Sequence, residues 1–296
     1  MKTIALIATK EFSDRFRSGW VIACVLVWLG AIGLTSLFGL AQIGRFGLQG
    51  YERTVVSLLN LVQYLVPLLA LLLGHDLVAS EREDRTLPLV VACGATRGYW
   101  LLGKFLGGCL TLAFPLALGF TIAGIVIGLT VRERGLGAFL ILAGSSLLLG
   151  IVFVGVGLAI SAFSRTRVQA LVIALLAWST AVFAFDLVAL GVVVSSQAAT
   201  ASEEIEKATD ATHVVSVEDL HRQYEGAKDN AQHLVPAAPR RFSPWLVLNP
   251  VDLFRAINLP QTVALRVPVA AAALAISVWL IVPLGFGVWQ LRRLDL

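Results

Sequence analysis

The sequence predicts an all-α membrane protein with six transmembrane helices, an N-terminal interfacial helix, a short cytoplasmic helix and a long external loop between spans 5 and 6. Hydrophobic residues make up 57% of the 296 residues and charged residues only 14%, with a mean hydropathy of +0.83. That apolar content exceeds what one soluble core of this size buries, so the bilayer must act as the solvent. Long apolar runs then predict the spans, because in hydrocarbon a helix satisfies its own backbone hydrogen bonds.

Six runs are long enough for the ~20 residues that cross the hydrocarbon core. They cover approximately residues 20–42, 55–78, 100–130, 137–163, 168–195 and 267–291. Buried helices of soluble proteins are the alternative, but those are usually shorter and carry a polar stripe. The six runs therefore predict six spans.

The first 19 residues have the pattern of an interfacial amphipathic helix. Ile4, Ile7, Phe12 and Phe16 recur at helical spacing, with charged side chains mostly on the other side. An ordinary charged lead-in to the first span would need no such apolar face, so the interfacial helix is favoured. A cleaved signal peptide is disfavoured, because charges stand where its apolar core would be.

The orientation follows from the distribution of Lys and Arg over the short loops. One set of loops carries twelve basic residues: Lys2, Lys10, Arg15, Arg17, Arg82, Arg85, Arg97, Lys104, Arg165, Arg167, Arg292 and Arg293. The opposite set carries four: Arg45, Arg53, Arg132 and Arg134. The excess predicts that both termini and residues 75–87 are cytoplasmic. Lys104 stands near the end of a span, where we expect its side chain to snorkel towards water.

The chain divides into four regions. Residues 1–19 form the interfacial helix, residues 20–195 hold the first five spans, residues 196–266 form the external loop, and residues 267–296 hold span 6 and a cytoplasmic tail. The external loop is polar from Thr200 to His233 and then becomes amphipathic and rich in Pro. An external interfacial helix is predicted near residues 245–259, with Asn249, Asp252 and Arg255 as its polar residues.

Polar residues inside the spans are candidates for function, because burying them unpaired is costly. Asn60, Gln63 and Tyr64 share about one face of the second span, and Asp186 lies in the fifth. Asn60 and Gln63 could line a translocation path or could tie helices together by hydrogen bonds, and the sequence favours neither. For Asp186 a structural role at a helix interface is favoured.

No pattern predicts catalysis, a metal site or a cofactor site in this chain. His213, His221 and His233 match no metal-binding spacing, and Ser145 and Ser146 have no histidine within the spans to activate them. The three cysteines lack paired spacing, which predicts free thiols. The chain has no Gly-rich phosphate-binding loop and no basic patch for nucleic acid, so any ATP-driven work must come from another polypeptide.

Residues 75–87, HDLVASEREDRTL, place a block of both charge signs between two apolar runs. We expect a short cytoplasmic helix within residues 80–97, with Glu81, Glu83 and Asp84 on a soluble face and Leu87, Leu89 and Val90 on an apolar one. A solvated loop would not account for the apolar half. Such a helix could fit a groove on a soluble partner.

This block and its surroundings resemble the coupling-helix region of permeases of ATP-binding-cassette (ABC) transporters, of the drug and polysaccharide exporter class. The resemblance rests on the acidic cluster, Thr86-Leu87, Arg97 and Gly103-Lys104, in that order. It extends to the permeases of systems that mature nitrous oxide reductase, through the stretches LVPLLALLLGHDLVASERED, LLGKFLG, FAFDLVAL and WLVLNPVDLFRAINL. Their common order across nearly the whole chain makes the resemblance specific.

The resemblance implies a permease subunit in the cytoplasmic membrane of a bacterium or archaeon. It would form a homodimer with two cytoplasmic ATPases, which would hold the ATP and magnesium. The coupling helix that docks on each ATPase would comprise Glu81, Arg82, Glu83, Asp84, Arg85, Thr86 and Leu87. In such systems the ATP cycle either exports a cargo such as a sulfur species or drives a periplasmic copper-site assembly protein mechanically. Export of an unrelated substrate is a further alternative.

Three features depart from the family's pattern. Arg85 stands where many relatives have Gly before Thr-Leu, Gly94 stands near a usual Pro, and residues 196–242 form a longer external loop than expected. The first two hardly disturb docking. The third leaves the external partner or cargo open.

Overall fold

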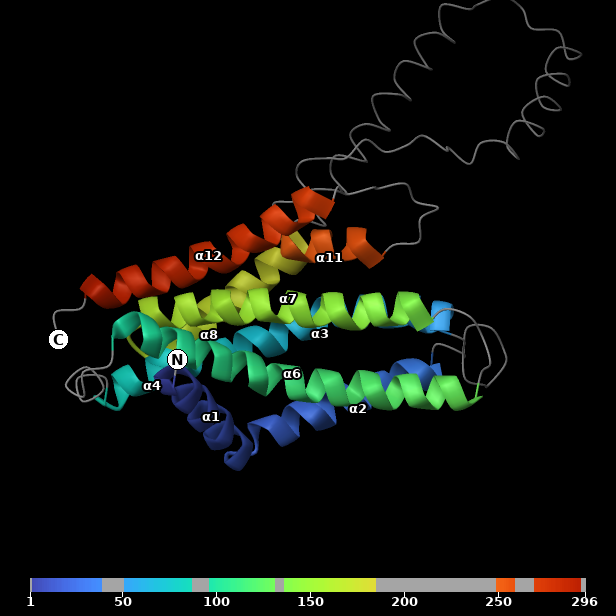
Figure 1. Cartoon of the computed structure of the whole chain (residues 1–296), viewed down its shortest axis with the longest axis horizontal. Coiled ribbons are helices and arrows are strands. Elements are labelled where there is room, and N and C mark those ends of the chain that lie inside the picture. Colours follow the sequence, from blue (N-terminus) through green and yellow to red (C-terminus); the bar gives the residue numbers. More distant parts are fainter. Residues whose placement is uncertain are drawn as a thin grey trace, which may run out of the picture.

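The computed structural model describes residues 2–38, 51–86, 96–130, 136–184, 249–258 and 269–293, and within these ranges every regular element is a helix (Figure 1). The α-helices are α1 (Lys2–Arg17), α2 (Trp20–Phe38), α3 (Tyr51–Gly74), α4 (Asp76–Glu83), α6 (Arg97–Thr130), α7 (Leu136–Phe163), α8 (Arg167–Ser179), α11 (Pro250–Asn258) and α12 (Val269–Arg293). A short π-helix, η2 (Thr180–Ala184), continues α8. The all-α fold class is thereby confirmed for the described part of the chain.

Helix α7 is the centre of the bundle. It packs against α3, α6, α8 and α12, and also against the two short helices α4 and α11. The long helices run side by side in Figure 1, so their ends gather at two opposite ends of the bundle. One end collects α4, the starts of α6 and α8, and the ends of α7 and α12; we call it the α4 end.

Four described helical segments are long and apolar enough to cross a membrane: Leu58–Glu83, Arg97–Ile125, Leu136–Phe163 and Ala272–Arg293. The bent pair Thr3–Arg17 and Trp20–Gly33 raises the number to five if it forms one span. The fifth predicted span, residues 168–195, corresponds to a shorter apolar helix over Arg167–Phe183, and residues 185–195 lie outside the described ranges. A multi-pass membrane protein is therefore established, and the count of six stays a prediction.

The bend between α1 and α2 is made by Gly19. This residue has a φ of +79°, a left-handed conformation that glycine adopts without the steric cost of a Cβ. The Gly19 N–H donates to the Phe16 carbonyl and the Ser18 hydroxyl to the Arg15 carbonyl, so the last turn of α1 is capped. The two helices consequently meet at 69°, and α1 lies across the bundle instead of extending α2 (Figure 1).

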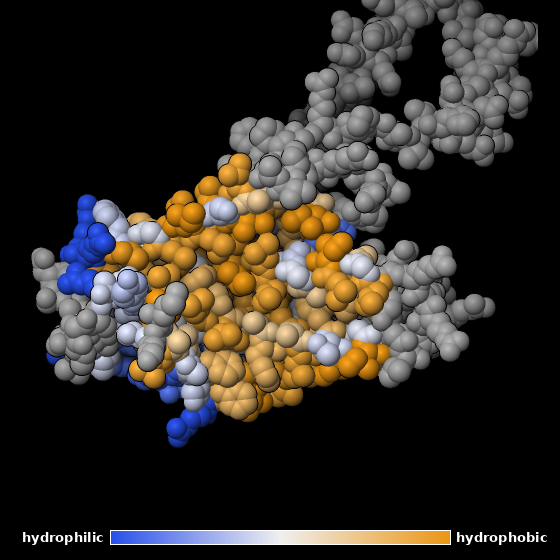
Figure 2. Space-filling view, in the orientation of Figure 1, coloured by the Kyte–Doolittle hydropathy of each residue, from blue (hydrophilic) through white to orange (hydrophobic). Residues whose placement is uncertain are grey.

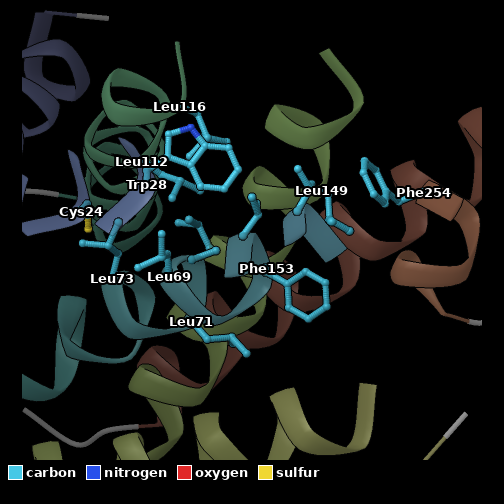
Figure 3. Packing of buried hydrophobic residues seen from close by; sticks show 14 of the residues in the cluster. Cys24, Trp28, Leu69, Leu71, Leu73, Leu112, Leu116, Leu149, Phe153 and Phe254 are labelled. Carbon is cyan, nitrogen blue, oxygen red and sulfur yellow. The ribbon is translucent and has the colours of Figure 1, made fainter. Parts of the chain in front are cut away.

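The core is a continuous apolar cluster along α3, α6 and α7. Trp28 of α2 is completely buried and packs beside Leu112 and Leu116 of α6, and Leu149 of α7 meets Phe254 of α11 (Figure 3). Outside this core the bundle is covered by exposed apolar side chains, such as Leu274 and Ile281 of α12. Figure 2 shows this apolar belt, with hydrophilic residues gathered at the α4 end. Such a surface suits a hydrocarbon surround.

Candidate functional site

Helix α4 starts with a cap that comes from another helix. The backbone N–H groups of Val78 and Ala79 both donate to the Ser161 hydroxyl of α7, each at 2.9 Å. His75, at the N-cap position, makes no side-chain cap of its own. The first turn of a helix has unpaired N–H groups that need acceptors, and here the fully buried Ser161 is the acceptor. The start of α4 is therefore attached to α7.

The crossing of α3 and α7 lies just before this cap. A Cβ built on Gly74 would come within 2.8 Å of the Gly157 Cα, and one built on Gly157 within 2.9 Å of the Gly74 Cα. The two backbones therefore touch, which glycine alone allows at this separation. This contact positions the break between α3 and α4 directly over α7.

Arg82 attaches the other end of α4 to the C-terminus of α7. Its guanidinium donates to the backbone carbonyls of Ala162, at 2.9 Å, and Ser164. These carbonyls lack partners within their own helix, and a cation there is favoured by the helix dipole. Arg82, predicted to be a docking residue, is thus directed into the chain's own structure.

Three acidic residues, Asp76 and Glu83 of α4 and its C-cap Asp84, converge on Arg167 at the start of α8. The Glu83 carboxylate accepts from the Arg167 backbone N–H at 2.8 Å, and the Arg167 side chain pairs with Asp84 and lies 3.8 Å from Asp76. Thr166 caps α8 by accepting from the Gln169 N–H. Helix α4 is consequently clamped on the turn between α7 and α8.

Lys104 of α6 joins α4 to α1. Its Nζ lies 2.9 Å from the Glu11 Oε2 of α1 and 2.8 Å from the Glu81 Oε1 of α4, and it also lies over the Trp100 ring. The residue is only 3% exposed, so the expectation that Lys104 snorkels to water was wrong. Two carboxylates and a ring hold its charge inside the protein instead.

Helix α1 packs on α6 through two glycines. A Cβ on Gly103 would overlap Ile7, and one on Gly107 would overlap the Glu11 side chain. Arg15 of α1 pairs with Glu11 at 3.2 Å and reaches Asp76 of α4 at 3.9 Å. The charges of α1, α4, α6 and α8 therefore form one connected cluster at the α4 end.

Helix α4 starts before the coupling helix that the sequence predicted. It runs from Asp76 to Glu83, and residues 87–95 of the predicted 80–97 range lie outside the described residues. The Thr86 N–H donates to the Glu81 carbonyl and the Arg85 N–H to the Arg82 carbonyl. Arg85 has a φ of +57°, the only positive φ of a non-glycine residue among those described. Together these bonds form a Schellman-type helix end with Arg85 in the left-handed position.

The exposed part of α4 is its C-terminal end. Glu83, Asp84, Arg85 and Thr86 are exposed, whereas Glu81, expected on the soluble face, points inward to Lys104. Leu87, the last residue of the predicted coupling helix, lies outside the described ranges. A soluble partner at this end would therefore meet residues 83–86.

A second polar cluster joins residues that the sequence had placed in separate groups. Arg255 of α11 donates from Nε to the Gln63 Oε1 of α3 at 2.6 Å, and Gln63 donates to the Asn60 Oδ1 at 3.2 Å. Arg255 also pairs with Asp252 at 3.1 Å. Gln63 is buried, whereas Asn60 is exposed. The Gln63 side chain therefore ties two helices together.

Asn249 caps α11 and also binds η2. Its Oδ1 accepts from the Val251 N–H at 3.1 Å, and its Nδ2 donates to the Ala181 carbonyl at 2.9 Å and to the Asp252 Oδ2. Asn at the N-cap and Pro250 at the first helical position are a favourable helix start. Helix α11 buries Val251, Leu253 and Phe254, so its apolar face packs into the bundle.

Aromatic residues complete this second cluster. The Trp178 indole N–H donates to the Tyr64 carbonyl at 3.0 Å, and the Tyr64 ring stacks on Phe183 of η2. Tyr64 is thus part of the contact between α3 and the α8–η2 segment. Asp186 lies outside the described ranges.

Sequence reasoning missed Gly74, Gly157 and Ser161. Serines and glycines are common in spans, and nothing in the sequence distinguishes the few that touch a neighbouring helix. Among the described residues no group of three or more His, Cys, Asp or Glu could hold a metal ion.

Comparison with known proteins identifies the family. A model of ABC-2 family transporter proteins matches residues 5–296. The chain is 35% identical over 297 residues to the probable ABC transporter permease protein NosY of Pseudomonas aeruginosa, with 94% of each chain covered. It is 34% identical over 265 residues to the probable ABC transporter permease protein NosY of Stutzerimonas stutzeri, covering 88% of this chain and 82% of that protein. The chain therefore belongs to the ABC-2 family of transporter proteins and is a permease subunit of an ABC transporter.

Proposed function

We propose that this permease works in the maturation of nitrous oxide reductase, as a homodimer bound to two cytoplasmic ABC ATPases. Members of the ABC-2 family generally dimerise and pair with ABC ATPase subunits, and both relatives above bear the name NosY. The ATPases hold ATP and magnesium and carry out the hydrolysis. This chain holds no cofactor and catalyses no reaction. It contacts its external partner on the side of the membrane opposite the ATPases.

The geometry of α4 is the observation that carries this proposal. Its exposed end, residues 83–86, is a short protrusion that an ATPase groove can grip. Its other residues are bound to α7, to Lys104 and, through Asp76, to Arg167 of α8. A displacement of residues 83–86 is therefore transmitted to the membrane helices and is not absorbed by a deformable loop. We place the α4 end in the cytoplasm, because Lys and Arg are concentrated there.

The docking experiment uses the exposed residues only. Glu83→Lys together with Asp84→Lys reverses two exposed charges, whereas reversing Glu81 would break the buried pair with Lys104. Both carboxylates also bind Arg167, so Arg167→Ala, which removes the side-chain pair and leaves the exposed acidic end unchanged, should retain the ATPase. We expect the double variant to lose co-purification of the ATPase from membranes while the permease still accumulates as a dimer. Asp14→Lys is the control, since Asp14 is exposed on α1; it should retain the ATPase.

Retention of the ATPase by the Glu83/Asp84 variant would show that α4 is not the docking element. The maturation role has its own readout, the copper content of nitrous oxide reductase in cells that lack the permease gene and are complemented with it. A fully loaded enzyme without the permease would exclude that role.

Export of a cargo is the second candidate. The exposed Asn60 within a predicted span favours it, because a polar side chain in a span usually faces water or another protein surface and not lipid. A path beside the second and fifth spans would pass Asn60. Asn60→Phe should then abolish function while ATPase binding and ATP hydrolysis persist, whereas full activity of this variant would favour purely mechanical transmission.

A further inference from the structure

Both short helices of the bundle are attached to the same three long helices. Helix α4 continues from α3, donates a backbone N–H to the Ser161 hydroxyl of α7 and binds Arg167 of α8. Helix α11 binds Gln63 of α3 and Ala181 of η2, which continues α8. Helix α11 also binds α7, because the Asn258 Nδ2 donates to the Ser145 hydroxyl at 2.8 Å.

The two sets of attachments lie about four helical turns apart along these helices. A helix rises 1.5 Å per residue, so Ser145 and Ser161 are separated by about 24 Å along α7, and Arg167 and Ala181 by about 21 Å along α8. Gln63 and Asp76 are separated by about 20 Å along α3 and the start of α4. The three separations agree closely, as expected of helices that run side by side (Figure 1).

The contacts between the three helices resist sliding. Gly74 and Gly157 place the α3 and α7 backbones in contact, and Trp178 of α8 donates to the Tyr64 carbonyl of α3. Packed helices in backbone contact move as a unit more readily than they deform. A displacement of α4 is therefore accompanied by a displacement of α11.

Helix α11 also holds the base of the external segment. The chain leaves η2 at Ala184 and re-enters the described structure at Asn249, whose amide nitrogen binds the Ala181 carbonyl. One side chain thus joins the element before the external segment to the helix after it. Arg255 then fixes that helix to Gln63 at 2.6 Å.

We propose that α11 is the output element of this permease, moved by α4 through the α3–α7–α8 unit, with the Arg255–Gln63 hydrogen bond as its joint to α3. Gln63 and Arg255 are positioning residues in this scheme. They determine the position of α11, and a change in that position displaces the external partner that α11 contacts. This inference rests on the proposed function, because the force at α4 comes from the ATPase.

The charges around the Arg255–Gln63 hydrogen bond indicate which substitutions would preserve this contact. Asp252 shares the Arg255 guanidinium, so removing Arg255 would leave a carboxylate without this partner. Gln63 is the better position to vary. Gln63→Leu removes the acceptor for Arg255 at similar size, whereas Gln63→Glu keeps an acceptor and adds a charge that the guanidinium can pair.

The experiment measures the motion of each short helix separately in the dimer with its ATPase. The background carries Cys24→Ala, Cys93→Ala and Cys109→Ala, and a single spin label is attached after either Arg165→Cys, on the turn to which α4 is clamped, or Ile257→Cys on α11; both positions are exposed. One label per copy gives one distance between the two copies by pulsed electron paramagnetic resonance. The nucleotide-free complex is compared with the vanadate-trapped complex.

We expect both distances to change on trapping. With Gln63→Leu the Arg165 distance should still change, while the change in the Ile257 distance is lost or its distribution broadens; Gln63→Glu should restore the change. An Ile257 distance that stays constant in the parent complex while the Arg165 distance changes would overturn the inference, as would an unaltered Ile257 change with Gln63→Leu. An Arg165 distance that does not respond to nucleotide would instead contradict the proposed docking of the ATPase.

Discussion

Arg85 illustrates how one residue can carry backbone strain at an exposed site. Its φ of +57° costs a residue with a Cβ roughly 1–2 kcal/mol, a cost that glycine avoids. Gly is the residue that the resemblance to ABC permeases implies at this position. The structure explains that preference, because the position is the left-handed residue of a Schellman-type helix end.

Two substitutions of Arg85 separate the effect of backbone strain on stability from the effect of its charge. Arg85→Gly should leave stability unchanged or raise it by up to about 1 kcal/mol, because relief of strain exceeds the extra entropy of glycine in the unfolded chain. Arg85→Ala removes the same charge without relieving φ and serves as the control. Thermal unfolding in detergent measures both. A glycine variant that melts below the alanine variant would contradict the assignment of strain.

At the scale of the elements, the crossing of α3 and α7 decides where α4 lies. Gly157→Ala would place a Cβ within 2.9 Å of the Gly74 Cα, so the helices must separate, at a cost of about 1–3 kcal/mol. Gly144→Ala is the matched control on the same helix, because its Cβ would meet nothing within 4 Å.

We expect the Gly157 variant to melt at a lower temperature and to bind less ATPase, since the Ser161 cap on α4 depends on the same crossing. The Gly144 variant should match the parent in both measurements. Equal stability of the two variants would mean that the backbones are not held in contact at Gly74 and Gly157.

At the scale of the whole molecule, the charged cluster and the apolar belt define a direction across the membrane. The ion pairs of α1, α4, α6 and α8 lie at the α4 end, and Figure 2 shows hydrophilic residues gathered there beside an apolar middle. Moving such a cluster through hydrocarbon would cost several kcal/mol per charge. The bundle therefore has one end suited to water and to a charged partner.

The proposed orientation predicts which positions are reached from outside the cell. In the background without native cysteines, Leu136→Cys, at the opposite end of α7, should react with an impermeant maleimide in intact cells. Arg165→Cys and Arg292→Cys, at the α4 end, should react only after the cells are permeabilised. All three positions are exposed. Reaction of Arg165→Cys in intact cells would reverse the orientation.

Sequence periodicity and charge were sufficient to predict which segments are apolar helices and which are charged, because these features depend on the solvent around each segment. The apolar runs predicted helices at α2, α3, α6, α7 and α12, and the charged block at residues 75–87 predicted a short helix in the region where α4 lies. The resemblance to ABC permeases was confirmed over residues 5–296. Hydrophobic burial acts on each segment separately, so composition and spacing reveal it.

The partners of individual polar groups were decided only by the tertiary structure. Lys104 was expected in water and lies between Glu11 and Glu81. Gln63 and Arg255, predicted in separate groups, share one hydrogen bond. Such contacts join residues far apart in the chain, and they depend on how closely two backbones approach. That approach is set by particular glycines, Gly74 and Gly157 among them, which the sequence alone does not distinguish from the others.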